Sequence, residues 1–156
     1  MIRVLVADDQ VLVRSGFRII LETEPDIEVV GEAANGLEAV ALAAKLTPDV
    51  ICMDVEMPEM NGIDASRQIL AAAAGSAASS ETERRVAPSI LVLTTFGHEE
   101  YLFDALAAGV SGFLLKTARA DQLIDAVRTL AAGGALLGPD VTRAVMERAT
   151  RDTVPA

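Results

Sequence analysis

Short, predominantly apolar runs alternate along this chain with longer stretches that carry helical periodicity. The runs lie at residues 2–7, 27–33, 50–53, 90–94 and 112–115. Strands of continuous apolar residues are typical of a parallel sheet that is covered on both faces, whereas strands with one wet face alternate between apolar and polar residues. Strands that alternate with helices therefore predict an α/β domain.

Helix-length segments separate these runs, at residues 11–22, 37–46, 63–74, 99–108 and 121–132. The last segment has the clearest pattern, because Leu123, Val127 and Leu130 recur on one helical face. Five βα units in this order predict a doubly wound, five-stranded parallel sheet with helices on both faces. For five strands we expect the flavodoxin-like order 2-1-3-4-5. A further short helix is expected at 140–149.

Length and composition limit the classes of function. The 156 residues are enough for one domain with a full core. No apolar run reaches the roughly 20 residues that cross a bilayer, the N-terminus is not a secretory signal, and Cys52 is the single cysteine. We therefore expect a cytoplasmic protein with no membrane contact and no internal disulfide. The formal net charge of −10 disfavours direct binding of nucleic acid, since an acidic surface repels phosphates.

Residues 71–87 interrupt the regular alternation. Their sequence, AAAAGSAASSETERRVA, is rich in alanine, serine and charge and has almost no large apolar side chain. Such a composition buries too little apolar surface to offset the entropy of ordering. We therefore expect a flexible insertion over about 71–88, and the alternative of a regulatory or docking element is disfavoured.

Polar side chains follow four of the five predicted strands. Asp8 and Asp9 follow the first strand, Asp54 the third, Thr94 ends the fourth and Lys116 follows the fifth. The carboxyl ends of parallel strands form one edge where ligands bind, so we expect these side chains to gather there. Clustered carboxylates favour a hard cation such as Mg²⁺. A carboxylate can attack phosphorus, and an ammonium and a hydroxyl can bind phosphoryl oxygens. The set predicts phosphoryl chemistry.

Five motifs, in this order, resemble those of the receiver domain of bacterial two-component response regulators. They are the acidic pair at 8–9, ANGLEA at 34–39, DVEMPEMNG at 54–62, LTT at 93–95 and AGVSGFLLK at 108–116. The resemblance covers residues 2–133. The sequences at 93–96, 101–106 and 133–137 further resemble the NarL/LuxR-type transcription factors, which carry a C-terminal helix-turn-helix domain.

The resemblance implies a role for each acidic residue. Asp54 would be the nucleophile that accepts the phosphoryl group. Asp9 would bind Mg²⁺ directly, with Asp8 helping through water or through its charge. The backbone carbonyl of Glu56 would be a further ligand. The implied metal set is therefore Asp8, Asp9, Asp54 and Glu56.

The resemblance also implies a switch rather than an enzyme. A sensor histidine kinase or a small acyl phosphate would be the donor. Thr94 and Lys116 would hold the phosphoryl oxygens, and Phe113 would rotate inward as Thr94 moves. We expect phosphorylation to promote homodimerisation and so to control DNA binding by a further domain. Residues 1–134 would be the receiver, and 135–156 a C-terminal helix and the start of a linker to a helix-turn-helix domain absent from this chain.

Other functions fit part of this pattern. A phosphatase of the haloacid-dehalogenase type also forms an aspartyl phosphate, and it needs an acid two residues after the nucleophile, where Glu56 stands. Its motif follows the first strand, however, whereas Asp54 follows the third. A pseudo-receiver usually lacks one of the acids, the threonine or the lysine, and all are present here. A dinucleotide-binding domain is excluded because no G-x-G-x-x-G follows the first strand.

Three further residues carry smaller expectations. Thr117 follows the lysine where many receivers have proline, and the isomer of the 116–117 peptide bond stays open. Cys52 lies within an apolar run and is expected to be an inert buried thiol. His98 is the single histidine and is expected to be an exposed loop residue, not a phosphodonor.

Overall fold

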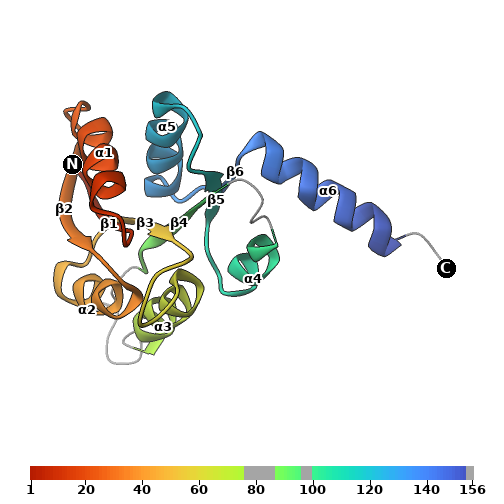
Figure 1. Cartoon of the computed structure of the whole chain (residues 1–156), viewed down its shortest axis with the longest axis horizontal. Helices are drawn as coiled ribbons and strands as arrows, with labels where there is room; N and C mark the ends of the chain where they lie inside the picture. The colour runs from red at the N-terminus through yellow and green to blue at the C-terminus, as the bar shows by residue number, and fades with distance from the viewer. Residues whose placement is uncertain (76–86, 96–99, 154–156) are drawn as a thin grey trace.

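A parallel sheet forms the centre of the molecule (Figure 1). The computed structural model describes residues 1–75, 87–95 and 100–153. The strands are β1 (Ile2–Ala7), β2 (Ile27–Ala33), β3 (Val50–Asp54), β4 (Ser89–Thr94), β5 (Gly112–Leu115) and β6 (Leu136–Leu137). Their order is β2-β1-β3-β4-β5-β6, and all pairs are parallel. The first five strands have the predicted order 2-1-3-4-5.

The predicted number of five strands is corrected by β6, which extends the sheet beyond β5. The amide of Leu136 donates to the carbonyl oxygen of Ser111 at 3.0 Å, and the amide of Gly138 donates to that of Phe113 at 3.0 Å. A strand of two residues has no apolar pattern of its own. Its formation depends on this pairing, which local sequence does not reveal.

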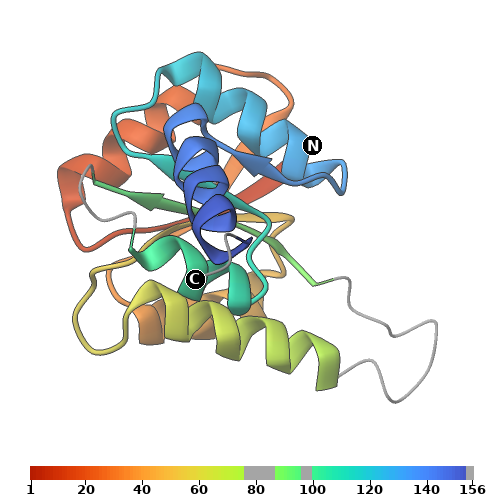
Figure 2. The ribbon, with the colours of Figure 1, turned by 90° about the vertical axis from the view of Figure 1, so that its right-hand side faces the viewer.

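Helices cover both faces of the sheet. They are α1 (Val11–Glu22), α2 (Gly36–Leu46), α3 (Gly62–Gly75), α4 (Tyr101–Ala107), α5 (Ala120–Ala131) and α6 (Pro139–Thr153). Helices α1 and α5 lie on one face, and α2, α3 and α4 on the other (Figures 1 and 2). Helix α6 leaves the β6 edge of the sheet and extends outward (Figure 1), and the guanidinium of its Arg148 lies 4.0 Å from the centre of the Phe103 ring on α4. None of the helices in the described residues is long and apolar enough to cross a membrane.

Each face of the sheet has its own hydrophobic core, because alternate residues of every strand point to opposite faces. Leu5, Ile51, Val92 and Phe113 face α2, α3 and α4, whereas Val4, Leu91 and Leu114 face α1 and α5. Cys52 belongs to the second core, as predicted, and burial raises the pKa of its thiol to about 12. The thiolate, which is the reactive form, is therefore suppressed.

Three sequence-based predictions concern residues that lie partly or wholly outside the described ranges. Helix α3 continues through residue 75, and the rest of the predicted insertion down to residue 86 is not described. The same holds for His98 and for the expected start of the fourth helix at residue 99. Those expectations stay predictions.

Candidate functional site

Three aspartates meet at the carboxyl edge of the sheet, as the sequence predicted. Asp8 and Asp9 follow β1, and Asp54 is the last residue of β3. One carboxylate oxygen from each lies within 4.8 Å of those of the other two. Asp8 and Asp54 are only 1% and 7% exposed, whereas Asp9 is open to solvent. The cluster is therefore buried at its base and accessible from one side.

Lys116 lies between the two buried carboxylates. Its Nζ is 2.6 Å from Oδ2 of Asp8 and 3.2 Å from Oδ1 of Asp54. The backbone amide of Lys116 donates to the carbonyl oxygen of Thr94 at 2.7 Å, so the end of β4 positions the lysine. Burial lowers the pKa of the ammonium. The hydrogen bond to Asp8 and the charges of both carboxylates raise it by more in total, so the net shift of the pKa is upward. The lysine therefore stays charged.

Asp54 is held in an environment that disfavours its charge. Burial and the neighbouring charge of Asp8 raise the pKa of its carboxyl to about 6, against the charge and hydrogen bond of Lys116 and the amide of Val55. That amide donates to Oδ1 of Asp54 at 2.9 Å. Near neutral pH the carboxyl is therefore mostly ionised but weakly stabilised, which suits a nucleophile.

The loop between β3 and α3 is closed tightly around Asp54. The amide of Gly62 donates to the carbonyl oxygen of Val55 at 2.8 Å. A Cβ at Gly62 would overlap the backbone carbonyl of Asp54, so only glycine allows this approach. Glu59, in the same loop, has a left-handed φ of 70°. The start of α3 thus supports the end of β3.

Glu56 is placed differently from the three aspartates. Its side chain is exposed, and its Oε1 accepts a hydrogen bond at 3.0 Å from the hydroxyl of Tyr101 on α4. Its carboxylate is not part of the aspartate cluster. A haloacid-dehalogenase-type phosphatase would need this acid beside Asp54, so the geometry disfavours that alternative. Tyr101 could not be related to Glu56 from the sequence, because 45 residues separate the pair and no local pattern connects them.

The remaining predicted residues, Thr94 and Phe113, are buried on the neighbouring strands β4 and β5. Thr94 ends β4 and is 2% exposed, in register with Leu115 beside Lys116. Phe113 is fully buried against α4 and its neighbours. Its side chain thus already occupies an inward position, and the predicted rotation stays a prediction. The described residues include no cis peptide bond, so the bond between Lys116 and Thr117 is trans.

The donor set fits a hard divalent cation. Mg²⁺ prefers carboxylate oxygens and keeps several waters, so it needs a site with one or two carboxylates and an open side. Asp9 and the edge of Asp54 offer that arrangement, while Lys116 already neutralises part of the charge of Asp8. The aspartate cluster therefore offers the oxygen ligands that a Mg²⁺ ion prefers.

Comparison with known proteins agrees with this geometry. Residues 4–128 match the family model of the response regulator receiver domain. LiaR, a transcriptional regulatory protein of Bacillus subtilis, is 40% identical over 95% of this chain and 64% of its own length. DegU of Brevibacillus brevis is 38% identical over 96% of this chain and 58% of its own length. The chain thus spans less than two thirds of these curated relatives.

Solved structures show the same fold. A two-component response regulator of the LuxR family from Aurantimonas sp. SI85-9A1 has a TM-score of 0.82 and 30% identity, over 95% of this chain and 97% of its own. The isolated REC domain of RcsB from Salmonella enterica serovar Typhimurium has a TM-score of 0.76 and 26% identity, over 91% and 96%. The chain belongs to the response regulator receiver domain family, in which its relatives are regulators of the LuxR/NarL type.

Proposed function

We propose that this chain is a Mg²⁺-dependent phosphoacceptor and that Asp54 takes the phosphoryl group. The observation that carries the proposal is the place of the Asp54 carboxylate, 3.2 Å from the ammonium of Lys116 and in one cluster with Asp8 and Asp9. Asp54 is the acid at the end of β3, the strand that lies between β1 and β4 in the sheet. Its raised pKa supports a nucleophilic role.

The metal would be held by Asp9 and Asp54, with the backbone carbonyl of Glu56 as a third protein ligand and Asp8 acting through water or charge. Bound Mg²⁺ would neutralise charge on the phosphoryl oxygens as they approach three carboxylates. Asp9 is the exposed member of the cluster, which leaves room for the ion's waters and for the donor. The acidic site alone would otherwise repel a phosphate.

In the transfer step, an oxygen of Asp54 forms a bond to phosphorus while the bond between phosphorus and the donor breaks. The donor leaves with the electron pair of that bond, so no proton needs to leave the ionised Asp54. Lys116 can then exchange its contact with Asp54 for one with a phosphoryl oxygen, since its Nζ is already 3.2 Å away. The hydroxyl of Thr94 would bind a second oxygen. These groups assist the chain's own phosphorylation and hydrolysis, without acting on another substrate.

Receiver domains of this family accept phosphoryl groups from sensor histidine kinases, and we propose such a kinase as the donor. We further propose that phosphorylation promotes a homodimer and controls DNA binding through a helix-turn-helix domain beyond residues 135–156. The support is that the curated relatives are transcriptional regulators that are longer than this chain. The acidic surface of the chain itself, with its net charge of −10, is unsuited to DNA.

Intact mass spectrometry tests the phosphoacceptor directly. The wild type and Asp54→Asn would be incubated with acetyl phosphate, with Mg²⁺ or with EDTA. We expect a gain of one phosphoryl group in the wild type with Mg²⁺ and in no other sample. A gain in Asp54→Asn equal to that of the wild type would refute the assignment. If neither gains mass, Mg²⁺-dependent binding of beryllofluoride separates a kinase-dependent receiver, which binds it, from a pseudo-receiver, which does not.

A further inference from the structure

Of the three clustered aspartates, Asp9 is the one whose carboxylate is not held by a contact with another described residue. It is exposed, and within the described ranges its carboxylate forms no hydrogen bond or ion pair. The place of this carboxylate therefore depends on the backbone between β1 and α1. Whatever orients the peptide between residues 8 and 9 also orients the Asp9 side chain.

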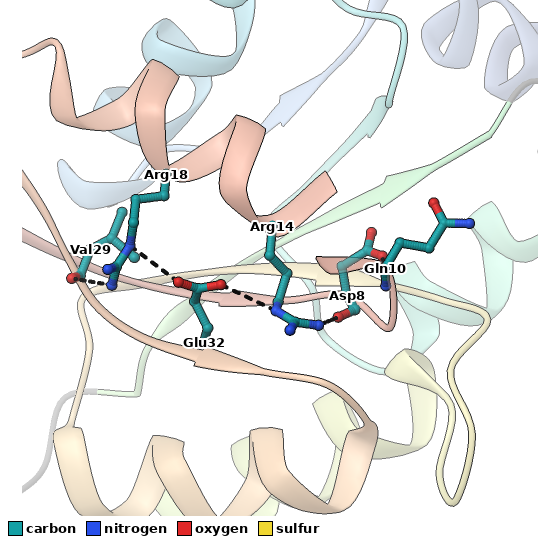
Figure 3. A network of polar contacts seen from close by, with 6 residues as sticks. All are labelled: Asp8, Gln10, Arg14, Arg18, Val29 and Glu32. Atoms are coloured by element: carbon teal, nitrogen blue, oxygen red, sulfur yellow. Dashed lines mark hydrogen bonds and ion pairs between the residues drawn. The ribbon is translucent and has the colours of Figure 1, made fainter. Parts of the chain in front are cut away.

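Arg14, on the first turns of α1, contacts that peptide. Its Nη1 donates to the backbone carbonyl oxygen of Asp8 at 2.5 Å (Figure 3). The other contacts of Asp8 are a hydrogen bond from its amide to Ala33, one from the amide of Gln10 to its Oδ1, and the ion pair with Lys116. Those three hold the strand end and the Asp8 side chain. The Arg14 bond holds the carbonyl, and so the plane of the peptide that leads into Asp9.

The guanidinium of Arg14 is itself held in place. Its side chain is only 13% exposed, and its Nε lies 3.2 Å from Oε1 of Glu32 on β2. The second carboxylate oxygen of Glu32 lies 3.3 Å from Nε of Arg18, one turn further along α1. Figure 3 shows Glu32 between the two arginines. Arg18 also donates to the carbonyl oxygen of Val29 at 3.3 Å, and it has no contact with Asp8 among the described residues.

We propose that Arg14, held by Glu32, is a positioning residue of the metal site: it fixes the 8–9 peptide and thereby holds the Asp9 carboxylate where a divalent cation needs it. The inference rests on the proposed function, since it concerns the same site. Groups that orient metal ligands from behind typically contribute 10- to 100-fold to metal affinity. An exposed ligand such as Asp9 depends strongly on such support, because its own side chain has none.

The direction of the effect separates positioning from simple charge. A cation near the site repels Mg²⁺, so removal of a positive charge alone makes Mg²⁺ bind more tightly. Loss of positioning makes it bind more weakly. Arg18 provides the matched control: it carries the same charge, pairs with the same Glu32 and ties the same helix to the same strand. Arg18→Ala therefore removes an ion pair with Glu32 and a hydrogen bond between the same helix and strand, but it leaves the contact of Arg14 with the carbonyl of Asp8 intact.

The experiment is isothermal titration of Mg²⁺ into the wild type, Arg14→Ala, Arg18→Ala and Arg14→Lys, with melting temperatures measured in EDTA. We expect both alanine variants to melt at similarly lowered temperatures. Mg²⁺ binding should weaken about tenfold in Arg14→Ala, by the usual effect of losing such support, and should not weaken in Arg18→Ala. Arg14→Lys keeps the positive charge and takes the place of Arg14→Ala in the experiment if the alanine variant does not fold. Arg14→Lys should also bind Mg²⁺ more weakly.

Two results would overturn the inference: unchanged or tighter Mg²⁺ binding in either folded Arg14 variant, or equal weakening in Arg14→Ala and Arg18→Ala. The phosphorylation of the wild type by acetyl phosphate then shows what remains. If the wild type gains a phosphoryl group, only the role of Arg14 is wrong. If the wild type neither binds Mg²⁺ nor gains mass, the proposed function and the inference are both wrong.

Discussion

The ammonium of Lys116 lies 2.6 Å from Oδ2 of Asp8, across the carboxyl edge of the sheet. Its distance to Asp54 is longer, at 3.2 Å. The lysine is thus paired mainly with the acid of β1 and only secondarily with the acid proposed as nucleophile. This arrangement offsets the repulsion between two buried carboxylates, although burial and the charge of Asp8 still raise the pKa of Asp54 to about 6.

The pKa of Asp54 predicts a pH-dependent gain in stability for Asp54→Asn. The carboxyl has a pKa of about 6 in the folded chain and an ordinary value of 3.8. Ionisation of Asp54 therefore favours unfolding. The contribution of this carboxyl lowers the free energy of unfolding as pH rises from about 4 to about 6 and is constant at higher pH. At roughly 1.4 kcal/mol per pKa unit, Asp54→Asn should be more stable at pH 7 by at most about 3 kcal/mol.

Urea unfolding in EDTA at a series of pH values checks this prediction. Effects of other acids cancel in the difference between the two proteins, so that difference should grow between pH 4 and pH 6 and then level off. A difference that is independent of pH would show that Asp54 is not destabilised by burial.

Lys116→Met should have the opposite effect. The side chain of Lys116 is 15% exposed and lies against two carboxylates, and its removal would leave them facing each other without a cation. Breaking a buried ion pair costs about 3–5 kcal/mol, and we expect about 2 kcal/mol because the lysine is partly open to water. The loss should shrink at pH 5, where Asp54 in the variant takes up a proton.

The control for Lys116→Met is Lys45→Met, which changes an exposed lysine at the end of α2. Unfolding in urea should show a lower free energy of unfolding for Lys116→Met and not for Lys45→Met. Equal effects of both substitutions would mean that net charge, rather than the site, determines the outcome.

Two Gly→Ala substitutions, one at the tight β3–α3 loop and one in helix α1, should have opposite effects on stability. A Cβ at Gly62 would overlap the backbone carbonyl of Asp54, whereas a Cβ at Gly16 in α1 meets no atom within 4 Å. Gly62→Ala should therefore destabilise the protein and abolish its phosphorylation by acetyl phosphate. Gly16→Ala should stabilise it by about 0.5–1 kcal/mol, as alanine does in a helix interior, and should be phosphorylated normally.

Thermal unfolding and intact mass, measured on both glycine variants, decide this prediction. Normal phosphorylation of Gly62→Ala would show that the loop tolerates a shift at Asp54, and the close approach would then be unimportant for the site.

The contact between Tyr101 and Glu56 can be read from one spectroscopic titration. Tyr101 is the single tyrosine of the chain, which has no tryptophan, so tyrosinate absorbance reports this residue alone. Its hydrogen bond to Glu56, followed by the charge of that carboxylate, raises the pKa of the phenol above its ordinary value of 10.0. Glu56→Gln should lower the pKa toward that value. An unchanged titration, with circular dichroism showing the fold intact, would mean that the contact is not formed in solution.

Much of the fold follows from local pattern. Strands β1, β2 and β5 and helix α1 have the predicted bounds, because a predominantly apolar run or a helical periodicity is a property of neighbouring residues. Strand β6 was missed, since its formation depends on pairing with β5 and not on its own sequence. The gathering of Asp8, Asp54 and Lys116 was predictable too, because parallel strands end at one edge whatever their spacing in the chain.

The amino-acid sequence by itself determined the alternation of strands and helices and the residue types at the site edge, since both follow from periodicity and from the place of each polar residue after a strand. Only the tertiary structure decided which atoms meet. Lys116 pairs first with Asp8, Arg14 binds the carbonyl of Asp8, and Tyr101 binds Glu56. Such pairings depend on side-chain rotamers and on distances of a few ångströms between distant segments. Residue spacing does not encode these distances, because they result from the packing of whole elements.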